Sequence, residues 1–291
     1  ASVKLPSAKQ IIARYYLSGM YYEKDVIKGE KLLYEAAEKD ENIKLDVAID
    51  YLEGNLLKKN LIKGQNLLRE LYMKGNIGAK IEYAKREIEG MDEIKKKEGE
   101  KTIRFLASKN LVAKRVLFVC AIEKKLEMTS DEINNLFKDL HEQKDTYSML
   151  FYANKALEQR ILDLSVEDAK KLFLECIELG DAKAKYYYAK YLINGDILER
   201  DVIYGKRLLE ELICTGDIPA KYYYAQLNIE NYVFSDYDLG WKYMKELEGV
   251  GYEPALLYLA NAYMKGSFIK QNIDYGKKLY LNLIEKGNEC A

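Results

Sequence analysis

The 291-residue chain is poor in the residues that most often carry chemistry or cross-links. It has one His, three Pro and four Cys. The cysteines occur at no repeated spacing, which favours free thiols over a disulfide framework; they are Cys120, Cys176, Cys214 and Cys290. Free thiols suit a reducing compartment, but a periplasmic location stays open, and no segment of the sequence assigns the compartment.

The chain also lacks an excess of one charge and any long apolar run. Its 46 basic and 47 acidic residues give a net charge of −1, whereas a nucleic-acid binder needs a basic stripe or patch. No stretch approaches the ~20 consecutive apolar residues of a membrane span. We therefore expect no nucleic-acid partner and no insertion into a membrane.

Motifs for catalysis and cofactor binding are absent as well. The sequence contains no G-x-S-x-G, no P-loop and no G-x-G-x-x-G. One His without a Cys cluster supplies no metal site of the usual ligand types. His141 falls in a column of half-buried positions, where we expect it to pack against its neighbours. We expect no catalytic residue, no metal and no cofactor, and we interpret the protein as non-enzymatic.

What the chain does have is a repeat of 34 to 36 residues. Each repeat opens with apolar and small residues at offsets 0, 4, 5 and 8, which share one face of a helix. The repeats start at Ala8, Ile43, Ala79, Ala113, Ser148, Ala184, Ala220 and Ala255. The residue five places later is Ala in all but one repeat, which allows two helices to approach closely: Ala13, Ala48, Ala84, Phe118, Ala153, Ala189, Ala225 and Ala260.

A second helix follows in each repeat. Its expected N-caps are mostly short polar residues: Asp25, Asn60, Lys95, Thr129, Ser165, Asp201, Asp236 and Asn272. Four residues after each cap stands a column that is mostly Gly: Gly29, Gly64, Gly99, Ile133, Ala169, Gly205, Gly240 and Gly276. A Gly inside a helix costs roughly 1 kcal/mol relative to Ala, so its recurrence predicts close packing of backbone at this position.

Eight helix pairs with short connections predict an all-α solenoid. We expect a single domain over residues 1–291 with degenerate repeats at 113–183. There Phe118 replaces the small residue, and Lys124 and Gln159 replace the Gly that ends the first helix in most other repeats.

The repeat resembles a known family. The pattern A-x-x-x-Φ-A-x-x-Y-x-x-G, followed by a cap and a small residue, is similar to the Sel-one-like repeat, a relative of the tetratricopeptide repeat. Ala8, Ile12, Ala13, Tyr16 and Gly19 match it position by position. The resemblance covers residues 7–287 and implies a protein-interaction scaffold. It names no partner.

Analogy with tetratricopeptide repeats places the binding surface on the concave face, at offsets two, six and nine of the first helices. The predicted binding residues are Tyr186, Lys190, Tyr222, Gln226, Leu257 and Asn261, with Ile193, Ile229 and Met264 at offset nine. The 26 Tyr residues are either an interface feature or the product of an AT-rich genome.

Three functions are consistent with these features. The first is an adaptor that binds a peptide or protein. The others are a bacterial immunity or inhibitor protein that neutralises one toxin or enzyme, and a structural subunit of an envelope or secretion assembly. Because no capping helix follows the last pair, we also expect Leu259, Leu279 and Leu283 to be partly exposed and to allow self-association through the C-terminal repeat.

Overall fold

The computed structural model describes residues 5–159, 164–230, 234 and 236–285. These residues form sixteen helices and contain no strand, so the predicted all-α fold of eight helix pairs is confirmed. The first helices are α1 (Leu5–Ser18), α3 (Glu41–Glu53), α5 (Ile77–Glu89), α7 (Leu111–Ile122), α9 (Thr146–Gln159), α11 (Ala182–Asn194), α13 (Ile218–Ile229) and α15 (Glu253–Lys265). The second helices are α2 (Val26–Ala37), α4 (Leu61–Met73), α6 (Glu93–Ala107), α8 (Ser130–Glu142), α10 (Val166–Glu178), α12 (Val202–Cys214), α14 (Tyr237–Gly249) and α16 (Ile273–Glu285).

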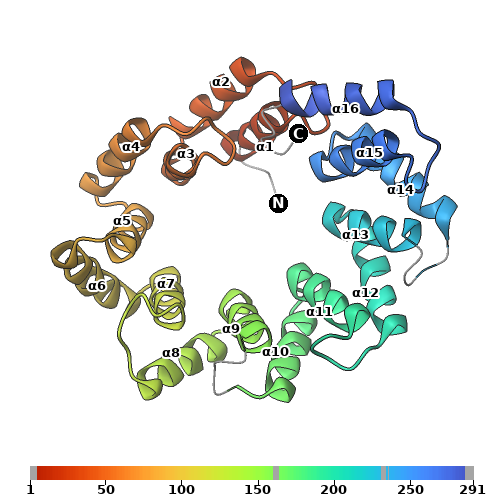
Figure 1. The fold of residues 1–291 in the computed structure, drawn as a ribbon. Coiled ribbons are helices and arrows are strands. Elements are labelled where there is room, and N and C mark those ends of the chain that lie inside the picture. The colour runs from red at the N-terminus through yellow and green to blue at the C-terminus, as the bar shows by residue number, and fades with distance from the viewer. Residues whose placement is uncertain (1–4, 160–163, 231–233, 235, 286–291) are drawn as a thin grey trace. The chain divides into compact units, whose positions relative to one another are not determined.

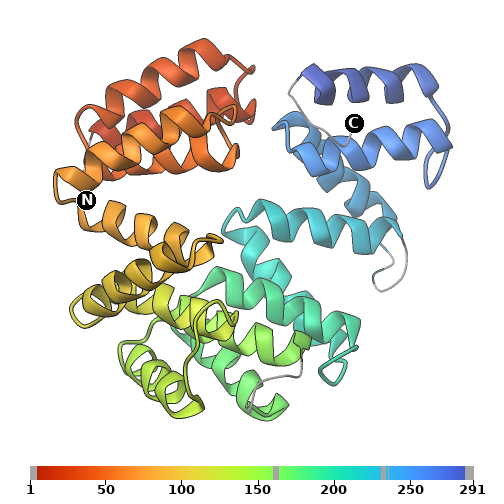
Figure 2. The same cartoon turned by 60° about the vertical axis from the view of Figure 1, so that its left-hand side comes forward.

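The chain divides into two compact units. Unit 1 combines Ala1–Leu61 with Val202–Ala291, and unit 2 spans Ile62–Asp201. Within unit 2 the first helices α5, α7, α9 and α11 lie on one face, and α6, α8 and α10 lie on the other (Figure 1). Within unit 1 the helices of the pairs α1/α2 and α15/α16 pack along each other (Figure 2). The expectation of a single domain stays a prediction.

Short polar side chains begin most of the second helices, as predicted. The Asp25 carboxylate accepts from the amide of Lys28 at 2.9 Å, and Thr129 forms a capping box with Glu132. The exception is α6, which Asp92 caps in place of the expected Lys95. Asp92 accepts from the amides of Ile94 and Lys95, whereas a Lys side chain has no acceptor to offer.

First helices end in a left-handed residue at several predicted positions. Gly195 has φ +73° and donates its amide to the carbonyl of Tyr191. Lys124 occupies the same place after α7 and takes φ +57° although it is not glycine. Gly90 differs, because it follows α5 in an extended conformation. Asn231, the candidate after α13, lies outside the described residues.

The recurring glycines of the second helices face backbone carbonyls of the first helices. A Cβ added to Gly99 would lie 2.7 Å from the carbonyl oxygen of Ala84, and one added to Gly240 would lie 3.0 Å from that of Ala225. The two small-residue columns therefore face each other, as the repeated cost of glycine predicted. In the fourth repeat Phe118 stands in the alanine column, where it is buried and stacks on Phe137 at 5.6 Å between ring centroids.

The core follows the predicted columns with two corrections. Cys176 is fully buried as a small core residue. Tyr83 stands at offset four of the third repeat, on the face that carries the apolar pattern, but it is 40% exposed and its ring lies against Tyr72 of α4. The second correction concerns the last pair. The residues expected to be exposed there are buried, because α16 packs its apolar side on α15: Leu259, Leu279 and Leu283. The exposed apolar residues of α16 are instead Leu281 and Ile284, and self-association through this repeat stays a prediction.

Candidate functional site

The first-helix face of unit 2 carries a group of exposed apolar side chains. Val112 of α7 and Tyr147 of α9 are each 48% exposed. Val116 and Phe151 stand four residues further along the same helices and are half-buried, and Tyr187 continues the row on α11 and is exposed. We call Val112, Val116, Tyr147, Phe151 and Tyr187 the apolar strip.

Polar contacts between neighbouring repeats hold the strip in place. Arg115 donates from Nε to Asp145 at 3.1 Å and forms an ion pair with the same buried carboxylate. The guanidinium carbon also lies 4.9 Å from the ring centroid of Tyr147, which fixes this exposed ring. Between α9 and α11, the hydroxyl of Tyr191 donates to Asn154 at 3.0 Å. Burial and the nearby Glu158 carboxylate raise the pKa of Tyr191, so its hydroxyl remains a donor.

A row of carboxylates follows the strip at the C-terminal ends of the first helices of unit 2. We call Glu89, Glu123 and Glu158 the acidic row. The ammonium of Lys125 bridges two of them, at 2.7 Å from Glu89 and 2.8 Å from Glu123. Desolvation acts to lower the pKa of Lys125, but the two hydrogen bonds outweigh it and raise that pKa above its usual range. One end of this face therefore already holds an ammonium group between carboxylates.

Two of the predicted binding residues lie in unit 2, next to the apolar strip. Tyr186 and Lys190 are both half-buried on α11. The Lys190 ammonium lies 5.6 Å from the ring centroid of Tyr186, and the rings of Tyr186 and Tyr187 form a T-shaped pair. A tyrosine pair with a lysine over one ring is suited to contact both apolar and polar groups of a partner.

The other four predicted residues lie in unit 1 and are engaged in packing to different degrees. Tyr222 contacts the rings of Tyr252 and Tyr258 at 5.6 and 6.5 Å between centroids. Leu257 packs against the core of the last repeats, and Gln226 is half-buried on α13. Asn261 donates to the carbonyl of Leu257 and accepts from the hydroxyl of Tyr280, so its amide is already bonded within its own repeat. That the six residues make one site stays a prediction.

The expectation for offset nine is wrong at two of three positions. Ile193 and Ile229 are each only 1% exposed, and Met264 is half-buried. Nine residues advance a helix by two and a half turns, which places this offset only about 40° from the core position at offset five. The exposed side of a first helix instead carries offset three, offsets −1 and six one turn away from it, and offset ten two turns away.

That direction contains the residues that the sequence reasoning missed. The apolar strip occupies offsets −1 and three, and the acidic row occupies offset ten. The prediction relied instead on offset two, which in the degenerate repeats holds Arg115 and the buried Leu150. The helical angle between each offset and the buried offsets 0, 4, 5 and 8 was a partial signal, because the extent of the covered surface also depends on the neighbouring helices.

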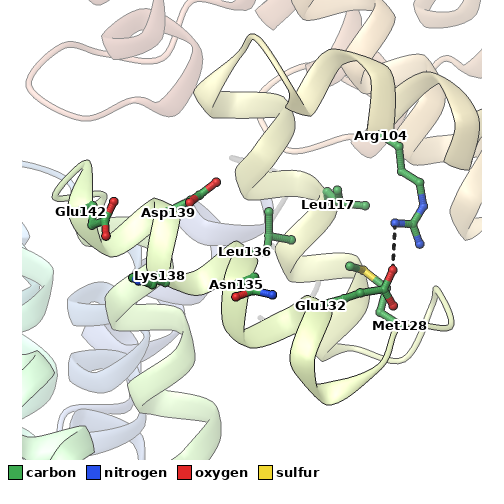
Figure 3. A pocket seen from close by; sticks show the side chains of 9 residues that line it. All are labelled: Arg104, Leu117, Met128, Glu132, Asn135, Leu136, Lys138, Asp139 and Glu142. Atoms are coloured by element: carbon green, nitrogen blue, oxygen red, sulfur yellow. Dashed lines mark ion pairs between the residues drawn. The ribbon is translucent and has the colours of Figure 1, made fainter.

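Unit 2 also contains a cavity of about 570 Å³ beside α8 (Figure 3). Its apolar floor is small, and charged side chains of both signs surround it; its lining is Arg104, Leu117, Met128, Glu132, Asn135, Leu136, Lys138, Asp139 and Glu142. Arg104 lies 3.8 Å from Glu132, and Asp139 pairs with Lys114 at 3.1 Å. Because these charges already pair within the protein, the cavity favours no one class of ligand.

No group of three or more His, Cys, Asp or Glu side chains among the described residues could hold a metal ion. Among the helices that the structure describes, none is both long and apolar enough to cross a bilayer. His141 pairs with Glu175 at 2.8 Å and stacks on Phe137.

Comparison with known proteins gives structural neighbours only. No family model matches the sequence, and no curated protein matches it. One solved structure that it resembles is c5321, described as a protective antigen present in uropathogenic Escherichia coli strains displaying an SLR fold. The TM-score is 0.51 at 15% identity, over 97% of this chain and 62% of that one.

This chain has the Sel1-like repeat fold. The resemblance stated from the repeat pattern is thus confirmed for the fold. A Sel1 repeat protein from Oxalobacter formigenes is similar at 16% identity with a TM-score of 0.49, over 98% of this chain and 73% of that one. The chain spans less than two thirds of the length of c5321.

Proposed function

We propose that this Sel1-like repeat protein is a non-enzymatic interaction scaffold that binds a peptide or protein surface on its first-helix face. The observation that carries the proposal is the apolar strip, which places exposed Val and aromatic side chains in a row across α7, α9 and α11. Contiguous apolar surface bordered by polar groups is the usual character of a protein-binding site.

Further features of the first helices in each unit support a protein ligand. Tyr is enriched at interfaces because its ring gives a large contact area with few rotatable bonds. Tyr186 and Lys190 extend the strip, and Tyr222, Gln226, Leu257 and Asn261 are the proposed contact residues of unit 1. The half-buried state of these side chains limits the entropy that they lose on binding.

Site-specific photocrosslinking in the source cell tests this proposal. A photoreactive phenylalanine analogue replaces Tyr187 on the first-helix face, and in a control protein it replaces Phe105, an exposed aromatic residue of α6 on the other face. We expect a crosslinked protein from position 187 and none, or a different one, from position 105. Identical crosslinks at both positions, or none at 187 while 105 reacts, would overturn the proposal.

The identity of the crosslinked partner also separates the three functions considered above. A toxin or an enzyme whose activity falls on binding indicates an inhibitor. An envelope or secretion component indicates a structural subunit. A partner recovered together with a second protein indicates an adaptor.

A further inference from the structure

We infer that the apolar strip and the acidic row of unit 2 together bind an extended partner segment that carries a bulky apolar residue and, about three residues away, a Lys or Arg. This inference rests on the proposed function, because it names the kind of segment that the first-helix face takes.

The spacing between the apolar and the basic residue of the partner segment follows from a pair of positions that recurs on two neighbouring first helices, α7 and α9. On α7, Val116 stands seven residues before Glu123, the residue that caps the C-terminus of this helix. On α9, Phe151 likewise stands seven residues before Glu158. Seven residues are close to two helical turns, so each carboxylate lies on the same side as its apolar partner, about 10 Å further along the axis. An extended chain advances about 3.3 Å per residue, so about three residues span the gap.

The apolar strip and the acidic row, which form the two ends of the proposed binding surface, differ in chemistry. At the apolar end, Val112 and Tyr147 leave about half of their surface in water, and a bulky side chain of a partner would cover it. At the acidic end, the carboxylates stand where the first helices end, and helix C-termini carry partial negative charge that favours cations. Glu123 and Glu158 are both exposed. Glu123 already pairs with Lys125. Glu158 instead accepts a 3.4 Å hydrogen bond from the Tyr191 hydroxyl, so Glu158 is the carboxylate expected to take the partner's cation.

The protein itself shows that this end accepts a cationic side chain. Lys125 bridges Glu89 and Glu123 with Nζ–O distances of 2.7 and 2.8 Å. The Lys155 ammonium lies 5.7 Å from the ring centroid of Phe151, so the aromatic part of the strip also has a cation at its face. A basic residue of a partner segment meets the same kinds of group near Glu158.

Selection of random peptides tests the inference, because a random library offers the apolar and basic residues in every order and at every spacing. The probe is a phage library of random twelve-residue peptides, selected on the whole chain. We expect the enriched peptides to share a Leu, Ile, Phe, Tyr or Trp with a Lys or Arg two to four residues away. Enrichment of sequences without this pair, or no enrichment at all, would overturn the inference.

A charge reversal gives the matched control. Glu158→Arg should weaken binding of the enriched peptides at least tenfold, whereas Glu178→Arg should leave it unchanged. Glu178 is an exposed residue at the end of the second helix α10, so both variants carry the same net charge. Glu158→Gln serves the same purpose if the arginine variant fails to fold. Equal binding to both single-site variants would refute a role for the acidic row.

The apolar end is tested separately. Tyr147→Ser removes the exposed ring that Arg115 covers, and the same peptides should again lose at least tenfold in affinity. If position 187 crosslinks a partner but these peptides do not respond to Tyr147 or Glu158, the scaffold function stands and this inference fails.

Discussion

Replacing Gly99 by Ala tests whether backbone contact between the two helices of a repeat explains the glycine column. The new Cβ would lie 2.7 Å from the carbonyl oxygen of Ala84, which is 0.7 Å shorter than the 3.4 Å at which ordinary contacts begin. It would also lie 2.8 Å from the Cβ of Glu87. Both atoms belong to or adjoin the backbone of α5, so no side-chain rotation relieves the clash, and α5 and α6 must separate.

The expected size follows from two opposing effects. Overpacking of a helix contact typically costs 1–3 kcal/mol, as a rough range. Ala in place of Gly in a helix returns roughly 1 kcal/mol of backbone entropy. We therefore expect a net loss of about 1 kcal/mol in the free energy of unfolding. Gly249→Ala is the matched control, because this glycine ends α14 with no atom within 4 Å of the added Cβ. There the entropy effect acts alone, and stability should rise.

Urea denaturation followed by far-UV circular dichroism measures both variants, and hydrogen exchange of α5 and α6 locates the effect if unfolding is not two-state. The change should appear in the midpoint with little change in the slope. The reasoning fails if Gly99→Ala stabilises the protein as Gly249→Ala does. The same comparison at Gly240 should also give a loss, because an added Cβ there would lie 2.9 Å from the Cβ of Asn228 and 3.0 Å from the carbonyl oxygen of Ala225.

Three further outcomes are expected. Tyr222→Ala should lower stability by about 1 kcal/mol because it removes ring contacts with Tyr252 and Tyr258, whereas Tyr186→Ala should change thermal stability little; equal melting shifts would contradict this difference. Burial acts to raise the pKa of Asp145, but hydrogen bonds from Arg115 and Ser148 outweigh it and hold that pKa below its usual range. Its contribution to stability is therefore complete above the unfolded pKa of about 4 and is lost as the pH falls through the folded value, so Asp145→Asn should flatten the acid limb of a stability–pH curve. Burial raises the pKa of Cys120 to about 11 and that of Cys176 to about 12, so at neutral pH in a Cys290→Ser background only the exposed Cys214 should react with a thiol reagent before unfolding.

The sequence by itself determined the local architecture. A period near 35 residues, a cap such as Thr129 and a turn glycine such as Gly195 are local signals, because capping and left-handed backbone depend on residues adjacent in the chain. Close packing of backbone at the glycine column was predicted too, since it explains a repeated loss of helix propensity, whereas the structure identified the alanine column as what faces it. The cap of α6 was missed because Asp92 stands one turn before the position that the period assigned.

The tertiary structure decided which side chains of each first helix reach solvent. A helical wheel gives an angle for every offset, but the width of the covered stripe depends on where the neighbouring helices lie. Ile193 is buried for this reason, although the sequence analysis placed it on the binding surface, and Tyr147, which that analysis did not consider, is 48% exposed. The bridging of Glu89 and Glu123 by Lys125 also needed the fold, because it joins residues of consecutive repeats that are far apart in sequence. Contacts of this kind depend on the distance between packed helices, which no local pattern specifies.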